Sequence, residues 1–287
     1  MNKFNHFFIL VLLLLSFSSC DNDDDWVNDN YLYPEIEEWF NYLCSPELGG
    51  RYSGSEGIKK AKNYICNIIG ESDSLTRISF PTDKCNMTNI IFHVDGDSDS
   101  LIVIGAHYDA YGYVNQTALP GADDNLSGVA VILQMIKTLQ KNRLHPYYSL
   151  EFCFWDGEEI GRYGSQFYVS NLSKPIKYYI NIDTCGNPYY GLGYGYSEYC
   201  LYLVDEFVDV QEKLSMKVEK YSPLNYTTDC EPFLNKKIPF ISIGNDVLPY
   251  YLHTQGDNIS IISFGRIDTI SNVLYEHLAN INNKFNF

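Results

Sequence analysis

The sequence predicts an α/β fold in which a single domain is built on a mostly parallel central sheet with helices on both faces. Two observations support this prediction. From residue 101 onward, short apolar runs typical of buried strands alternate with longer segments of helical periodicity. Residues 33–287 contain no linker, repeat or low-complexity stretch, and this length is ample for one large hydrophobic core. We therefore expect one folded domain over residues 33–287.

The elements follow in order from the apolar spacing. Two helices are expected first, over residues 34–44 and 55–69, because each has apolar residues at helical spacing on one face. The segment between them, SPELGGRYSGSEG, has the glycine and serine content of a loop. Further strands are expected at 75–80, 88–94, 101–104, 148–155, 177–182 and 238–243, and further helices at 128–139, 165–170, 199–214 and 267–281.

Histidines and carboxylates follow four of these strands or begin the helix at residue 128. Ligand sites in parallel sheets form beyond the carboxyl ends of the strands, so these side chains are expected at one edge. Taken singly, each has a structural explanation, such as a helix N-cap for Asp123, Asp124 and Asn125. Two histidines and three carboxylates together make a nitrogen and oxygen ligand set that suits zinc. The two histidines are His107 and His253, and the three carboxylates are Asp123, Glu159 and Asp183; Asp109 and Glu158 lie beside them in the same motifs.

The composition narrows the possible partners. The 36 acidic residues outnumber the 20 Lys and Arg residues and give a formal net charge of −16. Such a surface repels phosphate backbones, so we expect no nucleic acid partner.

Seven cysteines follow Cys20 at irregular spacing and without a CxxC pair, at positions 44, 66, 85, 153, 185, 200 and 230. Neither a dense disulfide framework nor a cysteine zinc site is indicated.

The first residues predict export rather than a part of the fold. Lys3 precedes an apolar run over residues 7–17 that is too short for a comfortable membrane span. The sequence FSSC that ends at Cys20 resembles the lipobox of bacterial lipoproteins, in which the cysteine is lipidated; an uncleaved helical anchor is the alternative. Residues 21–32 begin with an acidic run and predict a solvated tether. We expect a lipoprotein anchored to the cell envelope through Cys20, either periplasmic or surface-exposed.

Five motifs in order carry a family resemblance: HYDA, PGADDNLSG, FWDGEEIGRYGS, NIDTCG and YLHTQGD. They resemble the di-zinc aminopeptidases of metallopeptidase clan MH, whose relatives include bacterial leucyl aminopeptidases and glutaminyl cyclases. SPELGGRYSGSEG is similar to the N-terminal segment of the family, so the resemblance covers residues 35–285. It implies a zinc exopeptidase fold and an aminopeptidase that removes N-terminal residues from peptides through a metal-bridging water.

The resemblance also implies a role for each residue. His107 and Asp183 would bind one zinc ion, Glu159 and His253 the other, and Asp123 would bridge the two. Glu158 would be the general base, and Asp109 would fix the orientation of the His107 ring. A cis peptide bond is expected after the bridging aspartate.

One motif departs from the family. Ser-Asp-His before a Pro-Phe pair is usual, whereas this chain has Thr228, Asp229 and Cys230 there. The family's histidine is not a metal ligand, so zinc binding should survive, and the departure bears on the chemistry of the substrate pocket. Tyr226 is a candidate donor to a developing oxyanion.

Three other functions fit parts of the same pattern. A glutaminyl-peptide cyclotransferase would use a single zinc ion, but those enzymes commonly carry an insertion after the glutamate pair, where EEIGRYGSQFY is compact. A non-catalytic interaction domain is disfavoured because every expected ligand and the base are present. Carboxypeptidase activity on the same metal core is the third.

Overall fold

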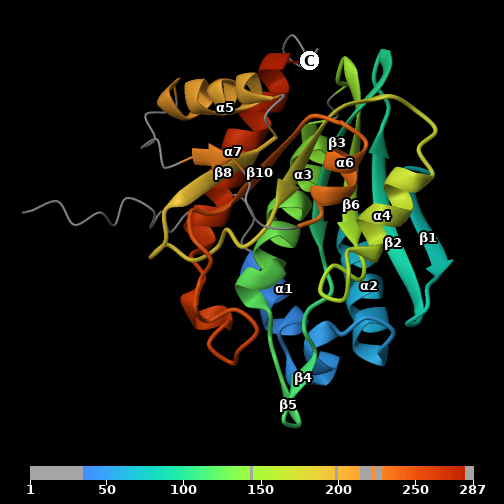
Figure 1. Cartoon of the computed structure of the whole chain (residues 1–287), viewed down its shortest axis with the longest axis vertical. Coiled ribbons are helices and arrows are strands. Elements are labelled where there is room, and N and C mark those ends of the chain that lie inside the picture. Colours follow the sequence, from blue (N-terminus) through green and yellow to red (C-terminus); the bar gives the residue numbers. More distant parts are fainter. Residues whose placement is uncertain (1–34, 143–144, 198–199, 214–220, 224–227, 282–287) are drawn as a thin grey trace, which may run out of the picture.

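A mixed eight-stranded sheet forms the centre of the described structure (Figure 1). The computed structural model describes residues 35–142, 145–197, 200–213, 221–223 and 228–281. The strand order is β1-β2-β6-β3-β7-β10-β8-β9. The strands are β1 (Leu75–Pro81), β2 (Asn86–Val94), β3 (Ser98–His107), β6 (Tyr148–Trp155), β7 (Ile176–Ile182), β8 (Leu192–Tyr196), β9 (Tyr221–Pro223) and β10 (Phe240–Asn245).

The four central strands, β6, β3, β7 and β10, run parallel to one another. Antiparallel pairing occurs outside this group, between β1 and β2, β2 and β6, and β10 and β8. The predicted α/β class with a mostly parallel centre is therefore confirmed. The carboxyl ends of the four parallel strands meet at one edge of the sheet, where the candidate residues were expected.

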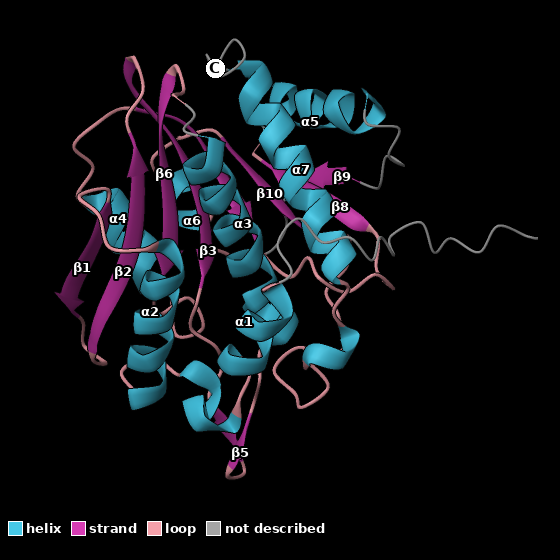
Figure 2. Cartoon of the chain, turned by 180° about the vertical axis from the view of Figure 1, so that it is seen from behind, coloured by secondary structure: helices cyan, strands magenta, loops and turns pink. Residues whose placement is uncertain are grey.

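Helices cover both faces of the sheet (Figure 2). One face carries α1 (Ile36–Leu43), α2 (Glu56–Ile69), α3 (Ser127–Asn142), α5 (Leu201–Lys213) and α7 (Phe264–Ile281). The other carries the short helices α4 (Tyr163–Ser170) and α6 (Glu231–Asn235).

The alternation of β3 side chains explains why both faces are apolar. Ile102 and Ile104 belong to the larger core cluster on the α3 face, whereas Leu101 and Val103 belong to the smaller cluster against α4 and α6. The run LIVI is therefore buried on both sides, as a central parallel strand requires.

The structure contains short elements that the sequence pattern did not predict. They are β8, β9, α6, the hairpin strands β4 (Tyr113–Val114) and β5 (Thr117–Ala118), and the helical turns η1 (Pro46–Arg51), η2 (Ala122–Leu126) and η3 (Ile259–Ile261). All have six residues or fewer, and β8 has the sequence LGYGY, so hydrophobic periodicity gives little signal for them. The signal segment, the tether and Tyr226 lie outside the described residues.

Arg51 ties the N-terminal loop to the edge of the sheet that carries the candidate residues. Its side chain is buried and donates hydrogen bonds to the carbonyl oxygens of Leu43, Tyr108, Pro120 and Gly121. Tyr108 directly follows β3, and Gly121 directly precedes η2. The segment predicted as a loop thus fixes two segments of the site.

Among the described helices, none is both long and apolar enough to cross a membrane.

Gly57 permits the close contact between η1 and α2. A Cβ atom at this position would lie 1.6 Å from the carbonyl oxygen of Leu48, which is far inside contact distance. Exchange of a helical glycine for alanine ordinarily stabilises a protein, because glycine loses more backbone entropy on folding. Here we expect Gly57→Ala to lower the free energy of unfolding by about 1–3 kcal/mol through overpacking.

Urea denaturation of the purified protein measures this change. Asn67→Ala is the matched control, since it introduces alanine at an exposed position of the same helix and should be neutral or slightly stabilising. Equal stability of Gly57→Ala and the parent protein would contradict the close contact.

Candidate metal centre

The candidate ligands come from four parallel strands and one helix start. His107 is the last residue of β3, and Asp183 directly follows β7. Glu159 follows β6 after a turn, and His253 lies in the loop after β10. Asp124 lies in η2, which leads directly into α3. Residues far apart in the sequence thus meet at the carboxyl edge of the sheet.

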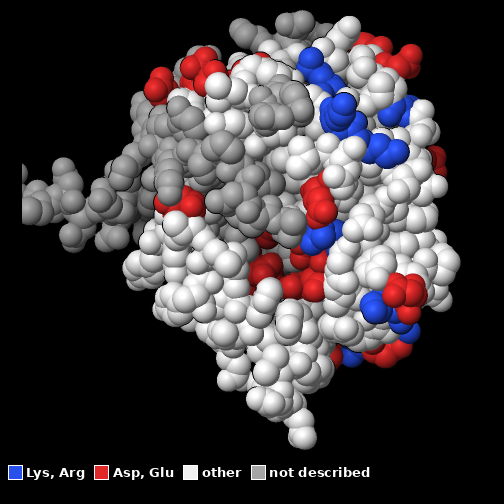
Figure 3. All heavy atoms as spheres, viewed as in Figure 1, with Lys and Arg blue, Asp and Glu red and all other residues white. Residues whose placement is uncertain are grey.

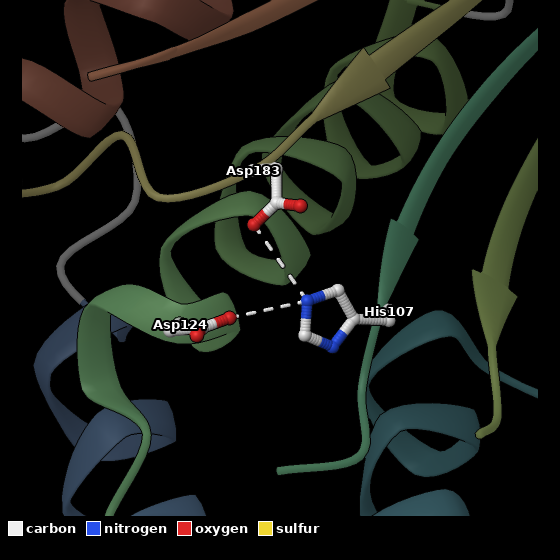
Figure 4. Close-up of side chains that lie close together, drawn as sticks. All are labelled: His107, Asp124 and Asp183. Atoms are coloured by element: carbon white, nitrogen blue, oxygen red, sulfur yellow. Dashed lines mark ion pairs between the residues drawn. The ribbon is translucent and has the colours of Figure 1, made fainter. Parts of the chain in front are cut away.

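Two groups of potential ligands share Asp124. In the first, His107 Nε2 lies 3.2 Å from Asp124 Oδ1 and 3.6 Å from Asp183 Oδ1 (Figure 4). In the second, His253 Nε2 lies 3.2 Å from Asp124 Oδ2 and 3.0 Å from Glu159 Oε2. The ligand atoms within each group all lie within 4.8 Å of one another. Asp124 therefore directs one carboxylate oxygen to each group.

The expected bridging position of Asp123 is corrected to Asp124. The Asp123 carboxylate is buried and accepts hydrogen bonds from the Gly186 N–H (2.6 Å), the Asn245 side-chain amide (2.9 Å) and the Tyr251 hydroxyl. The Gly186 N–H binds Oδ1, and the other two donors bind Oδ2, so both carboxylate oxygens have partners. The expected cis peptide bond likewise lies after Asp124, where it joins Asp124 to Asn125. The other four predicted ligands lie together as expected.

Asp109 contacts both the His107 ring and the segment that carries the two glutamates. His107 Nδ1 lies 3.2 Å from the Asp109 carbonyl oxygen and 3.5 Å from its carboxylate Oδ1. The same carboxylate accepts the backbone N–H groups of Glu158 and Glu159, each at 3.2 Å. A hydrogen bond at Nδ1 leaves Nε2 free to bind a metal, as metal-ligating histidines generally require.

Glu158 lies beside both groups but belongs to neither. It lines the site cavity, and burial raises the pKa of its carboxyl group well above the usual range. Asp229, Asp183 and Glu159 act in the same direction as burial, whereas His107 opposes it. Asp229, from the motif that departs from the family, is buried and accepts a hydrogen bond from the Ser165 hydroxyl at 2.6 Å.

The charges of the site favour a bound cation. Burial, followed by the charge of Asp124, raises the pKa of Glu159 to about 7, and burial raises the pKa of Asp183. Contacts with Asp124 and Glu159 raise the pKa of His253 to about 10. Glu159 Oε1 is buried and has no hydrogen-bond partner among the described residues. Excess negative charge, an unpartnered carboxylate oxygen and a set of His and Asp/Glu donors fit divalent zinc.

A cavity of about 280 Å³ contains the two groups and Glu158. Figure 3 shows acidic side chains facing this hollow at the centre of the molecule. Arg162 also lines the cavity, but it forms an ion pair with Glu231 at 2.7 Å. Val247, Leu248 and Leu252 add an apolar wall.

Sequence reasoning missed a further carboxylate that fixes the site. Asp257 accepts the backbone N–H of Asp123 at 2.6 Å and that of Asp124 at 3.1 Å. It thus holds the turn that presents Asp124. Its signal was the final residue of the motif YLHTQGD, in which only the histidine was assigned a role.

Comparison with known proteins identifies the family. The model of peptidase family M28 matches residues 89–278. The chain belongs to peptidase family M28. Leupeptin-inactivating enzyme 1 of Streptomyces exfoliatus is 28% identical over 197 residues, which are 67% of this chain and 43% of that protein. The matched part of the chain spans between 17% and 57% of the length of the curated relatives.

Solved structures of other proteins share the fold. A leucine aminopeptidase precursor from Bacteroides thetaiotaomicron superposes with a TM-score of 0.72 at 19% identity, over 88% of this chain and 99% of that one. A glutaminyl cyclase from an Acidobacteriales bacterium superposes with a TM-score of 0.74 at 20% identity, over 90% and 98%. Since both named activities occur on this fold, the overall shape does not decide between them.

The correction from Asp123 to Asp124 gives a direct test. Asp124→Asn removes the charge shared by both groups, so we expect zinc affinity to fall by more than ~100-fold, beyond the usual effect of a residue that merely supports a ligand. Asp123→Asn is the matched control. Asp123→Asn should retain more zinc than Asp124→Asn. Its free energy of unfolding should fall by about 1–3 kcal/mol, because the amide group of asparagine places a donor against the donors that bind the carboxylate.

Zinc content after dialysis and thermal unfolding are measured for both variants. A zinc-loaded Asp124→Asn protein beside a zinc-depleted Asp123→Asn protein would restore the original assignment.

Proposed function

We propose that this protein is a zinc-dependent aminopeptidase that binds two zinc ions and releases the N-terminal residue of peptides. The observation that carries the proposal is the position of Asp124, which directs one oxygen to each of two histidine–carboxylate groups. His107 and Asp183 would hold one ion, Glu159 and His253 the other, and Asp124 both. The printed name of the Bacteroides thetaiotaomicron structure, a leucine aminopeptidase precursor, supports the same activity.

Bound zinc would supply Lewis acidity, which polarises a scissile carbonyl group and makes water a stronger nucleophile at neutral pH. The protein itself supplies the proton transfer. Glu158 lines the cavity without belonging to either ligand group, so its carboxylate is free to accept a proton from the attacking water. It would then give that proton to the departing amine. Asp109 positions this group because it holds the Glu158 backbone N–H.

The cavity favours the N-terminal end of a peptide. Glu158 lines it and belongs to neither ligand group, so its negative charge is not balanced directly by a bound zinc ion and can attract the α-ammonium group of a substrate. Its volume of about 280 Å³ and its wall of Val247, Leu248 and Leu252 suit an uncharged side chain. We therefore propose peptides with an apolar N-terminal residue as substrates.

The two adjacent glutamates should behave differently when each is changed to glutamine. Glu158→Gln removes the proton acceptor, so we expect kcat to fall by about 10²–10⁴ with both zinc ions retained. Glu159→Gln replaces a carboxylate ligand by a neutral amide, so zinc should be lost and activity should recover in part when zinc is added. Measurement of kcat and metal content across a zinc titration separates the two results.

A zinc-depleted Glu158→Gln protein beside a zinc-loaded Glu159→Gln protein would mean that the roles are reversed. Full activity in both variants would refute the catalytic assignment. The assay uses leucyl and glutaminyl peptides and detects both free amino acid and pyroglutamyl product. One zinc ion per chain together with ring closure of N-terminal glutamine would identify a cyclotransferase instead.

We also propose export and lipid anchoring at Cys20, on the basis of Lys3, the apolar run over 7–17 and the FSSC sequence. Cys20→Ala should release the protein from the membrane fraction or leave it unprocessed, because the thiol is the lipid acceptor. Cell fractionation with mass determination of the mature N-terminus measures this. A Cys20→Ala protein that stays anchored and fully processed would contradict the proposal.

A further inference from the structure

A second cavity, of about 490 Å³, adjoins the metal centre. Its walls include three tyrosines, Tyr52, Tyr111 and Tyr113, whose exposed fractions are 43%, 44% and 59%. Ile160 and Glu159 line it on the side of the metal centre. Three partly exposed aromatic rings around one hollow make a surface suited to uncharged, preferably aromatic, groups.

The hairpin β4–β5 and the turn η1 build this cavity through close glycine contacts. A Cβ atom at Gly50 would lie 2.3 Å from the carbonyl oxygen of Gly112, just before the hairpin. A Cβ atom at Gly49 would lie 2.6 Å from the Tyr113 hydroxyl, and one at Gly112 would lie 2.8 Å from the Tyr52 Cβ. All three glycines have positive φ. Tyr52 and Tyr113 thus pack directly against backbone, at positions where a residue larger than glycine would clash.

The cavity is continuous with the metal centre through two contacts. Glu159 lines both cavities. The ring of Tyr111 stacks on the imidazole of His253, with ring centroids 4.5 Å apart and planes 17° apart. A peptide bond placed at the metal centre therefore has residues of the substrate within reach of the tyrosines.

The charges of the two cavities differ. The cavity of the metal centre has Asp124, Glu158 and Asp183 in its lining, whereas Glu159 is the one charged residue among those that line the tyrosine cavity. The surface between the acidic hollow and the hairpin tip is uncharged in Figure 3. The α-ammonium group of a substrate is attracted to the first cavity, which leaves the second for the chain that follows the scissile bond.

We propose that the tyrosine cavity binds the side chain of the residue after the scissile bond and selects aromatic or large apolar residues there. This inference rests on the proposed aminopeptidase activity for the position of the bond. Stacking and burial of an aromatic ring among the tyrosines provide the selectivity.

The test compares two dipeptide amides, Leu-Phe-amide and Leu-Gly-amide, and their uncleavable analogues in which the peptide bond is reduced. Calorimetry measures the affinity of the zinc-loaded protein for the analogues, and release of leucine measures kcat/KM for the dipeptides. We expect a preference of ~10-fold or more for phenylalanine over glycine in both measurements. Tyr113→Ala should lower this preference by ~3–10-fold, since one aromatic contact is lost.

Tyr147→Ala is the matched control, because Tyr147 is 46% exposed and lies just before β6, at the opposite end of that strand from the metal centre. It should leave the preference unchanged. Equal affinity for the two analogues, or a preference that Tyr113→Ala does not change, overturns the subsite. Tight, Tyr113-dependent binding of the phenylalanine analogue without release of leucine supports the subsite and refutes the aminopeptidase activity instead.

Discussion

The burial of several carboxylates at one edge of the sheet is the constraint on which the rest of the site depends. Such groups repel one another in a medium of low dielectric constant, so each must find donors or a cation. An outer set of three carboxylates, those of Asp109, Asp123 and Asp257, accepts backbone N–H groups. Asp257 holds the N–H of Asp124, and Asp109 holds those of Glu158 and Glu159. The inner carboxylates are left facing the histidines.

Asp123 belongs to this outer set, and its role there explains why it is not between the histidines. It accepts the N–H of Gly186, in the loop that follows Asp183, and the hydroxyl of Tyr251, two residues before His253. One carboxylate thus contacts the loops that present two different ligands. The two aspartates are neighbours in the sequence but have different roles. Asp123 forms hydrogen bonds to other parts of the protein, whereas Asp124 faces the metal site.

The sequence predicted what periodicity and strand order control. The central strands and long helices have strong apolar patterns, and parallel strands bring their carboxyl ends together, so His107, Asp183 and Glu159 were placed correctly at one edge. The choice between Asp123 and Asp124 depends on backbone rotation within η2, where the φ and ψ angles of Asp124 and Asn125 are non-helical. Hydrophobic spacing contains no information on such a turn. The hairpin β4–β5 is too short for a periodic signal, so the tyrosine cavity was not foreseen either.

Arg51 connects the two cavities. Its guanidinium group binds the carbonyl oxygens of Tyr108 and Gly121, and its own carbonyl oxygen accepts the N–H of Ala110 at 3.3 Å. The first two contacts fix residues next to His107 and next to η2, whereas Tyr52 follows Arg51 directly in the tyrosine cavity. A buried guanidinium that binds several carbonyl groups is costly to displace, because each bond replaces hydration lost on burial. Arg51 therefore links the position of Tyr52 to that of the metal ligands, which suits a site that must align a peptide on both sides of the scissile bond.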